Sequence, residues 1–204
     1  MAKGGGYERE ISRTLSLWWT GGARDDVFWR TYGSGGRATT RRKKGKSTAG
    51  ACGDIVATDE VGAPFTKLTT TEVKRGYSAK KRGRGTAKPR NEPGASLHEL
   101  LDPAKPIKTP WAEWIVQART AAENAGTPYW AIIHRRDRRV ALIAVPYRLM
   151  RDLGILEPVC DVLLPVFECG AEIKPLGRVR FVVMRLDAFL ATVTSDAMRA
   201  LSQT

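Results

Sequence analysis

Two short stretches carry most of the information about this chain, Gly-Asp-Ile-Val-Ala-Thr-Asp at 53–59 and Thr-Thr-Glu-Val-Lys-Arg at 70–75. Both predict strands that are separated by a short connection. Successive side chains of a strand point to opposite faces, so Glu72 and Lys74 share one face of the second strand. If Asp54 lies beside them, the group has the parts of a divalent-metal site, with a lysine to steady an attacking water.

The charge of the chain is unevenly distributed. The 204 residues carry 34 Lys and Arg against 21 Asp and Glu, a net charge of +13. Residues 1–90 hold 20 of these basic residues and 8 of the acidic ones. This asymmetry favours a polyanionic partner for the N-terminal half, and nucleic acid is the polyanion we expect. A basic protein whose charge serves only its solubility is the alternative.

Cysteine usage and hydropathy exclude several classes of protein. Cys52, Cys160 and Cys169 are far apart and odd in number, and no Cys-x-x-Cys pair is present, which argues against a disulfide framework and a zinc site. No apolar run approaches the ~20 residues that span a bilayer, and the first residues lack the apolar core of a signal peptide. We therefore expect a soluble, cytoplasmic protein without a membrane partner.

Hydrophobic periodicity predicts an α/β core in which helices flank a mixed sheet. Up to residue 145 the predicted elements are a helix at 7–19 after a flexible glycine run, strands at 26–32, 53–58 and 67–74, a helix at 111–125, and strands at 128–134 and 140–145 around a basic turn. A hairpin turn at 59–64 is expected between the second and third strands. The remainder predicts a helix at 147–153, strands at 162–168 and 179–185, and a last helix that Asp187 caps and that runs through Leu201.

The length predicts a single domain over residues 1–204, with a core at about 4–146 and a C-terminal elaboration at about 147–204. Two basic loops interrupt the core. The loop at 36–50 has no apolar periodicity, and the loop at 76–110, with a helical turn expected at 97–101, is too long for a purely structural connection. Both are expected to bind phosphates.

Two glycine motifs near the first loop are excluded as nucleotide sites. Gly45-Lys46-Ser47 resembles the end of a phosphate-binding loop, but that motif needs a glycine where this chain has Thr40. Residues 33–38 resemble a dinucleotide fingerprint, yet the basic run behind them cannot pack as the helix that the fingerprint requires.

The pattern of Asp54 followed by Glu72-x-Lys74, with Glu8 on an early helix, resembles the PD-(D/E)xK nuclease superfamily. This chain has Gly53 at the position where the family has proline. Within the superfamily the chain is similar to the archaeal-type and phage Holliday-junction resolvases. Their first helix opens on a pattern similar to Gly-Gly-Tyr-Glu-Arg-Glu at 5–10. One of their strands ends, as residues 30–35 do here, in an arginine and a serine-containing glycine turn. The likeness is good over residues 4–76 and looser to about residue 146.

The resemblance implies a restriction-endonuclease-like core and a Mg²⁺-dependent endonuclease, with Mn²⁺ as a substitute metal. Carried over at the matched positions, Asp54 and Glu72 would ligate the metal together with the Val73 carbonyl. Glu8 would contribute from the first helix, and Lys74 would orient or help to deprotonate the attacking water. Hard oxygen ligands of this kind are those that Mg²⁺ takes.

The resemblance also implies two further site residues and a substrate. Ser34 resembles a resolvase serine near the scissile phosphate, and Gln117 resembles a polar residue of the second helix that faces the site. The substrate would be four-way or branched DNA, in recombination or repair. Basic residues expected to bind DNA lie in or beside the two loops: Arg30, Arg37, Arg41, Arg42, Lys43, Lys44, Lys46, Arg75, Lys80, Lys81, Arg82 and Arg84.

A homodimer is the simplest way to supply the two sites that symmetric junction cleavage needs. Trp18, Trp19, Trp111 and Trp114 are candidates for its face, with core packing as their alternative fate. A phage-encoded enzyme would act in the cytoplasm of the bacterial host. Two other functions stay open: a restriction- or repair-type nuclease on duplex DNA, and a non-catalytic nucleic-acid-binding protein. The retained carboxylates argue against the second, because a binder has no use for them beside phosphates.

Overall fold

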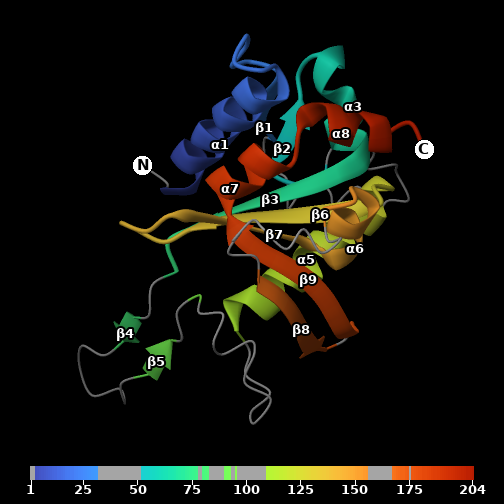
Figure 1. Cartoon of the computed structure of the whole chain (residues 1–204). Helices are drawn as coiled ribbons and strands as arrows, with labels where there is room; N and C mark the ends of the chain where they lie inside the picture. The colour runs from blue at the N-terminus through green and yellow to red at the C-terminus, as the bar shows by residue number, and fades with distance from the viewer. Residues whose placement is uncertain are drawn as a thin grey trace, which may run out of the picture.

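The central feature of the computed structural model is a five-stranded mixed sheet with the strand order β3-β6-β7-β9-β8 (Figure 1). The structure describes residues 3–31, 52–77, 80–82, 90–92, 95, 109–155, 167–174 and 176–204. Strand β3 runs parallel to β6, and the other neighbours are antiparallel. The strands are β3 (Thr69–Arg75), β6 (Tyr129–Arg135), β7 (Ala141–Pro146), β8 (Phe167–Ile173) and β9 (Gly177–Arg185). The predicted α/β class with a mixed sheet, consistent with a restriction-endonuclease-like fold, is confirmed.

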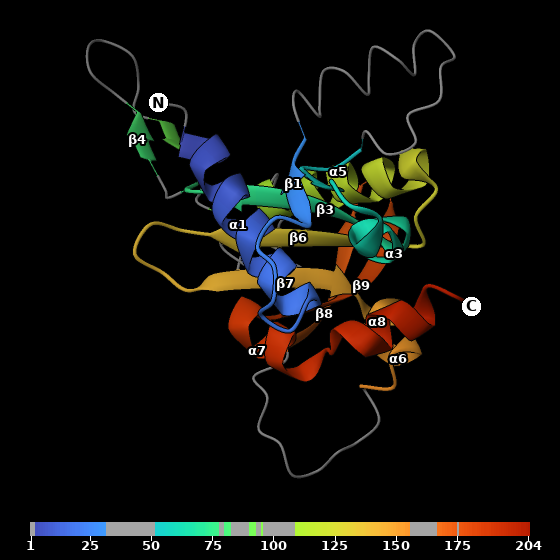
Figure 2. The same cartoon turned by 90° about the horizontal axis from the view of Figure 1, so that it is seen from above.

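Helices cover both faces of this sheet, and each face has its own hydrophobic core. On one face, α1 packs with four shorter helices, whereas α5 lies on the other face (Figure 2). The helices are α1 (Lys3–Trp19), α3 (Ala63–Leu68), α5 (Pro110–Ala125), α6 (Tyr147–Asp152), α7 (Leu186–Thr192) and α8 (Ser195–Leu201). None of the described helices is long and apolar enough to cross a membrane.

Strand β6 shows why the sheet is buried on both sides. Its residues are almost all apolar, and they alternate between the two cores: Ala131 and Ile133 face α1, while Trp130 and Ile132 face α5. A continuous apolar strand is typical of a sheet that helices cover on both faces. Strand β3, at the edge of the sheet, follows the same alternation but carries polar residues on its α5 face, so that face is where a site can form.

The predicted hairpin turn at 59–64 is wrong. Strand β2 (Ile55–Ala57) pairs with β1 (Phe28–Arg30), and a 3-10 turn, Glu60–Gly62, leads into α3 before β3 begins. Asp59 accepts a hydrogen bond from the Val61 N–H and thereby caps this turn. Pro64 lies in the first turn of α3, where its missing N–H costs nothing, so the Gly-Ala-Pro run begins a helix here.

The predicted last helix is interrupted. Residues 186–201 form α7 and α8, and Thr194 caps α8 by accepting from the Ala197 N–H. Asp187 lies inside the first turn of α7, where it pairs with Arg185, so the cap predicted there is wrong. The glycine run before residue 7 is also helical, because α1 begins at Lys3.

The other predicted elements that lie in the described residues are present with shifted ends, whereas residues 162–166 of the strand predicted at 162–168 lie outside them. Helix α5 begins one residue before the predicted helix, and the predicted strands at 26–32 and 53–58 shrink to the three-residue β1 and β2. Of the loop at 76–110, the structure describes a two-stranded pair, β4 (Lys80–Arg82) with β5 (Arg90–Glu92). The loop at 36–50 and the turn at 97–101 lie outside the described residues. Strands β8 and β9 continue the sheet, while the proposed boundary at residue 146 stays a prediction.

Gly126 and Gly6 allow a test of the α5 terminus. Gly126 ends α5 in the left-handed conformation (φ 71°), and a Cβ there would meet no atom within 4 Å. Gly126→Ala should therefore lower the free energy of unfolding by about 1–2 kcal/mol through backbone strain alone. Gly6, inside α1 and equally open, is the control: Gly6→Ala should raise stability by up to about 1 kcal/mol. Urea unfolding measures both, and equal effects would contradict the αL cap.

Candidate active site

Three hydrogen bonds to backbone groups hold Asp54 between β1 and the free edge of β3, and two of them are to β3. The Asp54 N–H donates to the Thr71 carbonyl (2.7 Å), and its own carbonyl accepts from the Thr31 N–H (2.9 Å). The carboxylate atom Oδ2 accepts from the Val73 N–H at 2.8 Å. The residue thus bridges β1 and β3. Its side chain is fixed at the edge of the sheet that β6 does not cover.

Gly53 makes this close approach possible. It has φ 82°, and a Cβ at this position would lie 2.9 Å from both the Thr71 carbonyl oxygen and Thr70 Cγ2. Proline, the family's residue at this position, has its φ locked near −65° and could not adopt this backbone. The departure at Gly53 is therefore a consequence of how this chain brings Asp54 to β3.

Glu72, Lys74 and Gln117 form a closed triangle on the α5 face of β3. Lys74 Nζ lies 2.7 Å from Glu72 Oε2 and 3.1 Å from Gln117 Oε1. Gln117 Nε2 donates to the same Glu72 oxygen at 2.8 Å. Glu72 is 3% exposed, so the triangle satisfies a carboxylate that is almost completely removed from water. The predicted shared face of Glu72 and Lys74 is observed, and Gln117 reaches them from α5.

The environment of Glu72 disfavours its charge. The pKa of Glu72 is raised to about 6. Burial is the largest cause, and the neighbouring Asp54 adds to it, both as a nearby charge and through a side-chain hydrogen bond. Lys74 acts in the opposite direction. Two carboxyl groups in contact repel each other once both are ionised. A cation between them, or a proton, would relieve this repulsion.

Glu8 approaches this group from α1. It is partly buried, and Arg30 on β1 lies 3.6 Å from its carboxylate. Burial raises the pKa of Glu8, and the charge of Asp54 raises it further, whereas Arg30 and Lys74 lower it. Glu8 is therefore close enough to interact electrostatically with Asp54 and Lys74, while its direct ion pair is with Arg30.

The donor set suits a hard divalent cation. Asp54 and Glu72 supply carboxylate oxygens. The Val73 carbonyl points to the same edge as the Val73 N–H, because both groups of one strand residue face the same side. No three His, Cys, Asp or Glu side chains among the described residues come close enough to hold a metal together. Mg²⁺ commonly binds through one or two carboxylates and completes its shell with water and phosphate, so two carboxylates are enough.

The remaining predicted residues fall into three groups. Arg75 follows Lys74 at the end of β3 and lies 3.7 Å from Asp137, and Arg30 is paired with Glu8. The backbone of β4 contains three further predicted residues, whose side chains are not described. Outside the described residues lie Ser34, Arg37, Arg41, Arg42, Lys43, Lys44, Lys46 and Arg84.

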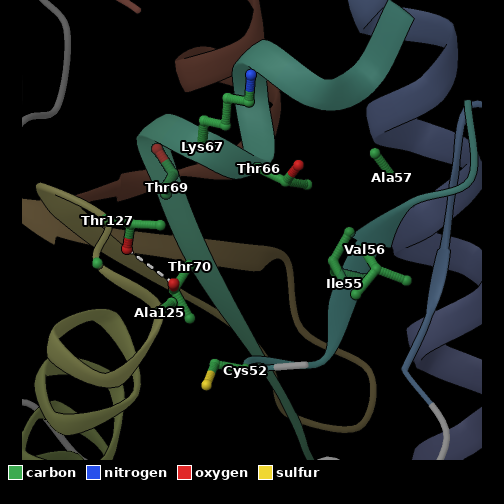
Figure 3. A pocket seen from close by; sticks show the side chains of 11 residues that line it. Cys52, Ile55, Val56, Ala57, Thr66, Lys67, Thr69, Thr70, Ala125 and Thr127 are labelled. Atoms are coloured by element: carbon green, nitrogen blue, oxygen red, sulfur yellow. Dashed lines mark hydrogen bonds between the residues drawn. The ribbon is translucent and has the colours of Figure 1, made fainter. Parts of the chain in front are cut away.

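A pocket of about 440 Å³, which none of the three triangle residues lines, has no counterpart in the sequence analysis (Figure 3). It lies between β2, the end of α3, the start of β3 and the turn after α5, where Thr70 and Thr127 hydrogen-bond across it at 2.8 Å. Thr70 precedes Glu72 by two residues on the same face of β3. Residues from four elements build this pocket, so no local sequence signal could have predicted it.

One comparison with known proteins bears on this part of the chain. Residues 1–82, which hold Glu8, Asp54, Glu72 and Lys74, match the family described as "Phage putative PDDEXK endonuclease". These residues are therefore similar to an endonuclease family of the PD-(D/E)xK superfamily. The matched region ends with β4, so it includes the three acidic residues predicted for the site, whereas Gln117, which hydrogen-bonds Glu72, lies outside the match. No curated protein and no solved structure matches the chain.

The raised pKa of Glu72 predicts a pH dependence. The folded pKa of about 6 exceeds the ordinary value of 4.5, so the folded state holds the proton more tightly. The stability that this proton contributes is present below pH 4.5 and is lost as the pH rises through about 6, a loss on the order of 2 kcal/mol. Urea unfolding in EDTA should show Glu72→Gln gaining stability relative to wild type across this window. A difference that does not vary with pH would contradict the assignment.

Proposed function

We propose that this protein is a Mg²⁺-dependent DNA endonuclease that hydrolyses phosphodiester bonds. The observation that carries the proposal is the contact of Asp54 and Glu72 on the free edge of β3, with Lys74 Nζ 2.7 Å from Glu72. Two carboxylates in repulsive contact are costly to keep unless a cation uses them. The match of residues 1–82 to an endonuclease family agrees with this chemistry.

The residues divide the work as follows. Asp54, Glu72 and the Val73 carbonyl would hold the cation, which when bound would acidify water and neutralise charge on the phosphate. Lys74 presents a compact positive charge to the attacking water and to the phosphate. Gln117 keeps Glu72 and Lys74 in place through hydrogen bonds to both. Preorganised groups of this kind pay no reorganisation cost during the reaction.

Glu8 supports the site from a second layer. Its ion pair with Arg30 at 3.6 Å and its electrostatic coupling to Asp54 and Lys74 support this role. From this position Glu8 would contact a bound cation only through water, as Mg²⁺ sites commonly allow.

We further propose branched or four-way DNA as the substrate and a homodimer as the active form. The likeness of residues 4–76 to the resolvases and the concentration of basic residues in 1–90 support this. A two-fold dimer supplies two cuts related by symmetry. Its face does not rest on Trp19, Trp111 or Trp114, which are each at most 5% exposed and belong to the cores.

Cleavage assays with the full chain test the proposal. With Mg²⁺, wild type should nick labelled junction DNA faster than flap, duplex or single-stranded DNA. Asp54→Asn and Lys74→Ala should each lower the rate on the order of 10²-fold or more, because each removes a group that acts on the transition state. Arg119→Ala, on the exposed side of α5, is the charge-matched control and should cleave as wild type does.

Three results would separate the parts of this proposal. No Mg²⁺-dependent cleavage of any substrate, or full activity in both site variants, contradicts the nuclease. Duplex cleavage at the junction rate contradicts the junction preference alone. Junction cleavage by a protein that sediments as a monomer at assay concentration contradicts the dimer.

A further inference from the structure

The turn between β6 and β7 carries an unusual density of positive charge. Residues 135–139 read Arg-Arg-Asp-Arg-Arg, and we name them the arginine turn. The last ladder pair, Arg135 with Ala141, lies at its base. In both views of the molecule this hairpin projects beyond the end of β3 (Figures 1 and 2). The side chains at its tip therefore extend away from the sheet.

Two ion pairs anchor the base of the arginine turn. Arg135 makes a two-pronged ion pair with Glu10 of α1 at 2.6 and 2.7 Å, and its guanidinium lies 4.5 Å from the centre of the Tyr7 ring. Asp137 lies 3.7 Å from Arg75 at the end of β3. The acidic residue of the turn is thus neutralised by another strand, and the hairpin is tied to both α1 and β3.

The other arginines of the turn have no acidic partner among the described residues. Arg136, Arg138 and Arg139 form no ion pair there, and Arg136 Nε is buried without a hydrogen-bond acceptor. Arg138 and Arg139 are exposed. Basic side chains on protein surfaces commonly find carboxylates nearby, so three arginines of one anchored turn that lack an acidic partner in the described part of the chain favour an external anion.

Arg138 is held in a conformation that arginine rarely adopts. The Arg139 N–H donates to the Arg136 carbonyl and closes a tight turn in which Arg138 has φ 60°. Glycine or asparagine is the ordinary residue at such a position, because a Cβ is disfavoured there. The chain keeps an arginine where the backbone favours glycine. Strain of this kind is typical of functional positions.

The register relates the arginine turn to the active site. Glu72 pairs with Ile132 and Arg75 with Arg135, so the base of the turn lies three residues beyond the carboxylate. At ~3.3 Å per residue this is roughly 10 Å, and the tip lies roughly 20 Å away. DNA advances ~3.4 Å per base pair. The turn and the site can therefore contact one duplex arm about three to six base pairs apart.

We propose that the arginine turn is a clamp for the phosphate backbone of duplex DNA, contacting it about three to six base pairs from the scissile phosphate. The proposal rests on the nuclease function in that it takes DNA as the substrate. Guanidinium groups bind phosphate oxygens in a two-pronged geometry, and these contacts position DNA without reading its sequence. The turn lies outside the two basic loops that the sequence analysis assigned to DNA.

The variant Arg138→Gly separates binding from folding. It removes one guanidinium and replaces it with the residue that the backbone favours, so its urea midpoint should equal or exceed that of wild type. Its affinity for a 30-base-pair duplex or a junction, measured in EDTA by fluorescence anisotropy, should fall about threefold to tenfold. The slope of log K against log salt should decrease by about 0.9. Replacing Arg136, Arg138 and Arg139 together by glutamine should decrease it by about 2.7.

A control and a length series sharpen the test. Arg148→Ala, on α6, removes an exposed guanidinium from another part of the molecule and should leave DNA affinity and salt slope unchanged. In the length series, the duplex arm on one side of the scissile phosphate and then the arm on the other side is shortened stepwise. The gap in affinity between wild type and Arg138→Gly should vanish once the arm on one side is shorter than about three base pairs, and should persist on the other side.

The possible outcomes test the clamp separately from the nuclease function. Unchanged DNA affinity and salt slope in the triple variant overturn the clamp. A triple variant that binds RNA or heparin more weakly but binds DNA as wild type does also overturns it. A wild type that binds no DNA overturns both the clamp and the proposed function. DNA binding that depends on the arginine turn, in a protein that cleaves nothing with Mg²⁺, supports the clamp and overturns only the nuclease.

Discussion

The attachment of Asp54 to the free edge of β3 is the constraint on which the candidate site depends. Two hydrogen bonds, one to the Thr71 carbonyl and one from the Val73 N–H, hold the residue as an additional strand would be held. Gly53 makes that approach sterically possible. Without these bonds Asp54 would be a loop aspartate in water. With them it interacts with Glu72, whose own carboxyl group is almost completely removed from water.

Two hydrogen bonds compensate for the burial of the Glu72 carboxylate. Lys74 and Gln117 both contact one oxygen of the carboxylate, and Lys74 and Gln117 contact each other. This arrangement fixes three side chains from two elements in one geometry, yet the pKa of Glu72 remains raised to about 6. Hydrogen bonds thus orient the group without removing its repulsion from Asp54. An oriented carboxylate pair of this kind is suited to a cation that arrives with its phosphate substrate.

Several features of the fold were predictable because their cause is local. Alternation along β3 was enough to place Glu72 and Lys74 on one face, and the periodicity from Trp111 to Ala125 was enough for α5. The connection before β3 was predicted wrongly because Gly and Pro occur both in turns and at helix starts, and only packing against β1 and β2 selects between them. The cap at Asp187 failed because α7 begins one residue earlier, at Leu186. The single last helix failed because it is interrupted at β-branched Val193 and Thr194, and Thr194 caps α8.

The sequence by itself determined the class of fold, the chemical identity of the site and the excess of positive charge, since these depend on residue type and short-range spacing. Only the tertiary structure decided which groups meet. It brought Gln117 to Glu72 from 45 positions away, turned Glu8 toward Arg30, and formed a pocket from four elements. It also left three arginines of the 135–139 turn without acidic partners among the residues that the structure describes. Such juxtapositions depend on how strands and helices pack in three dimensions, and no local pattern encodes that packing.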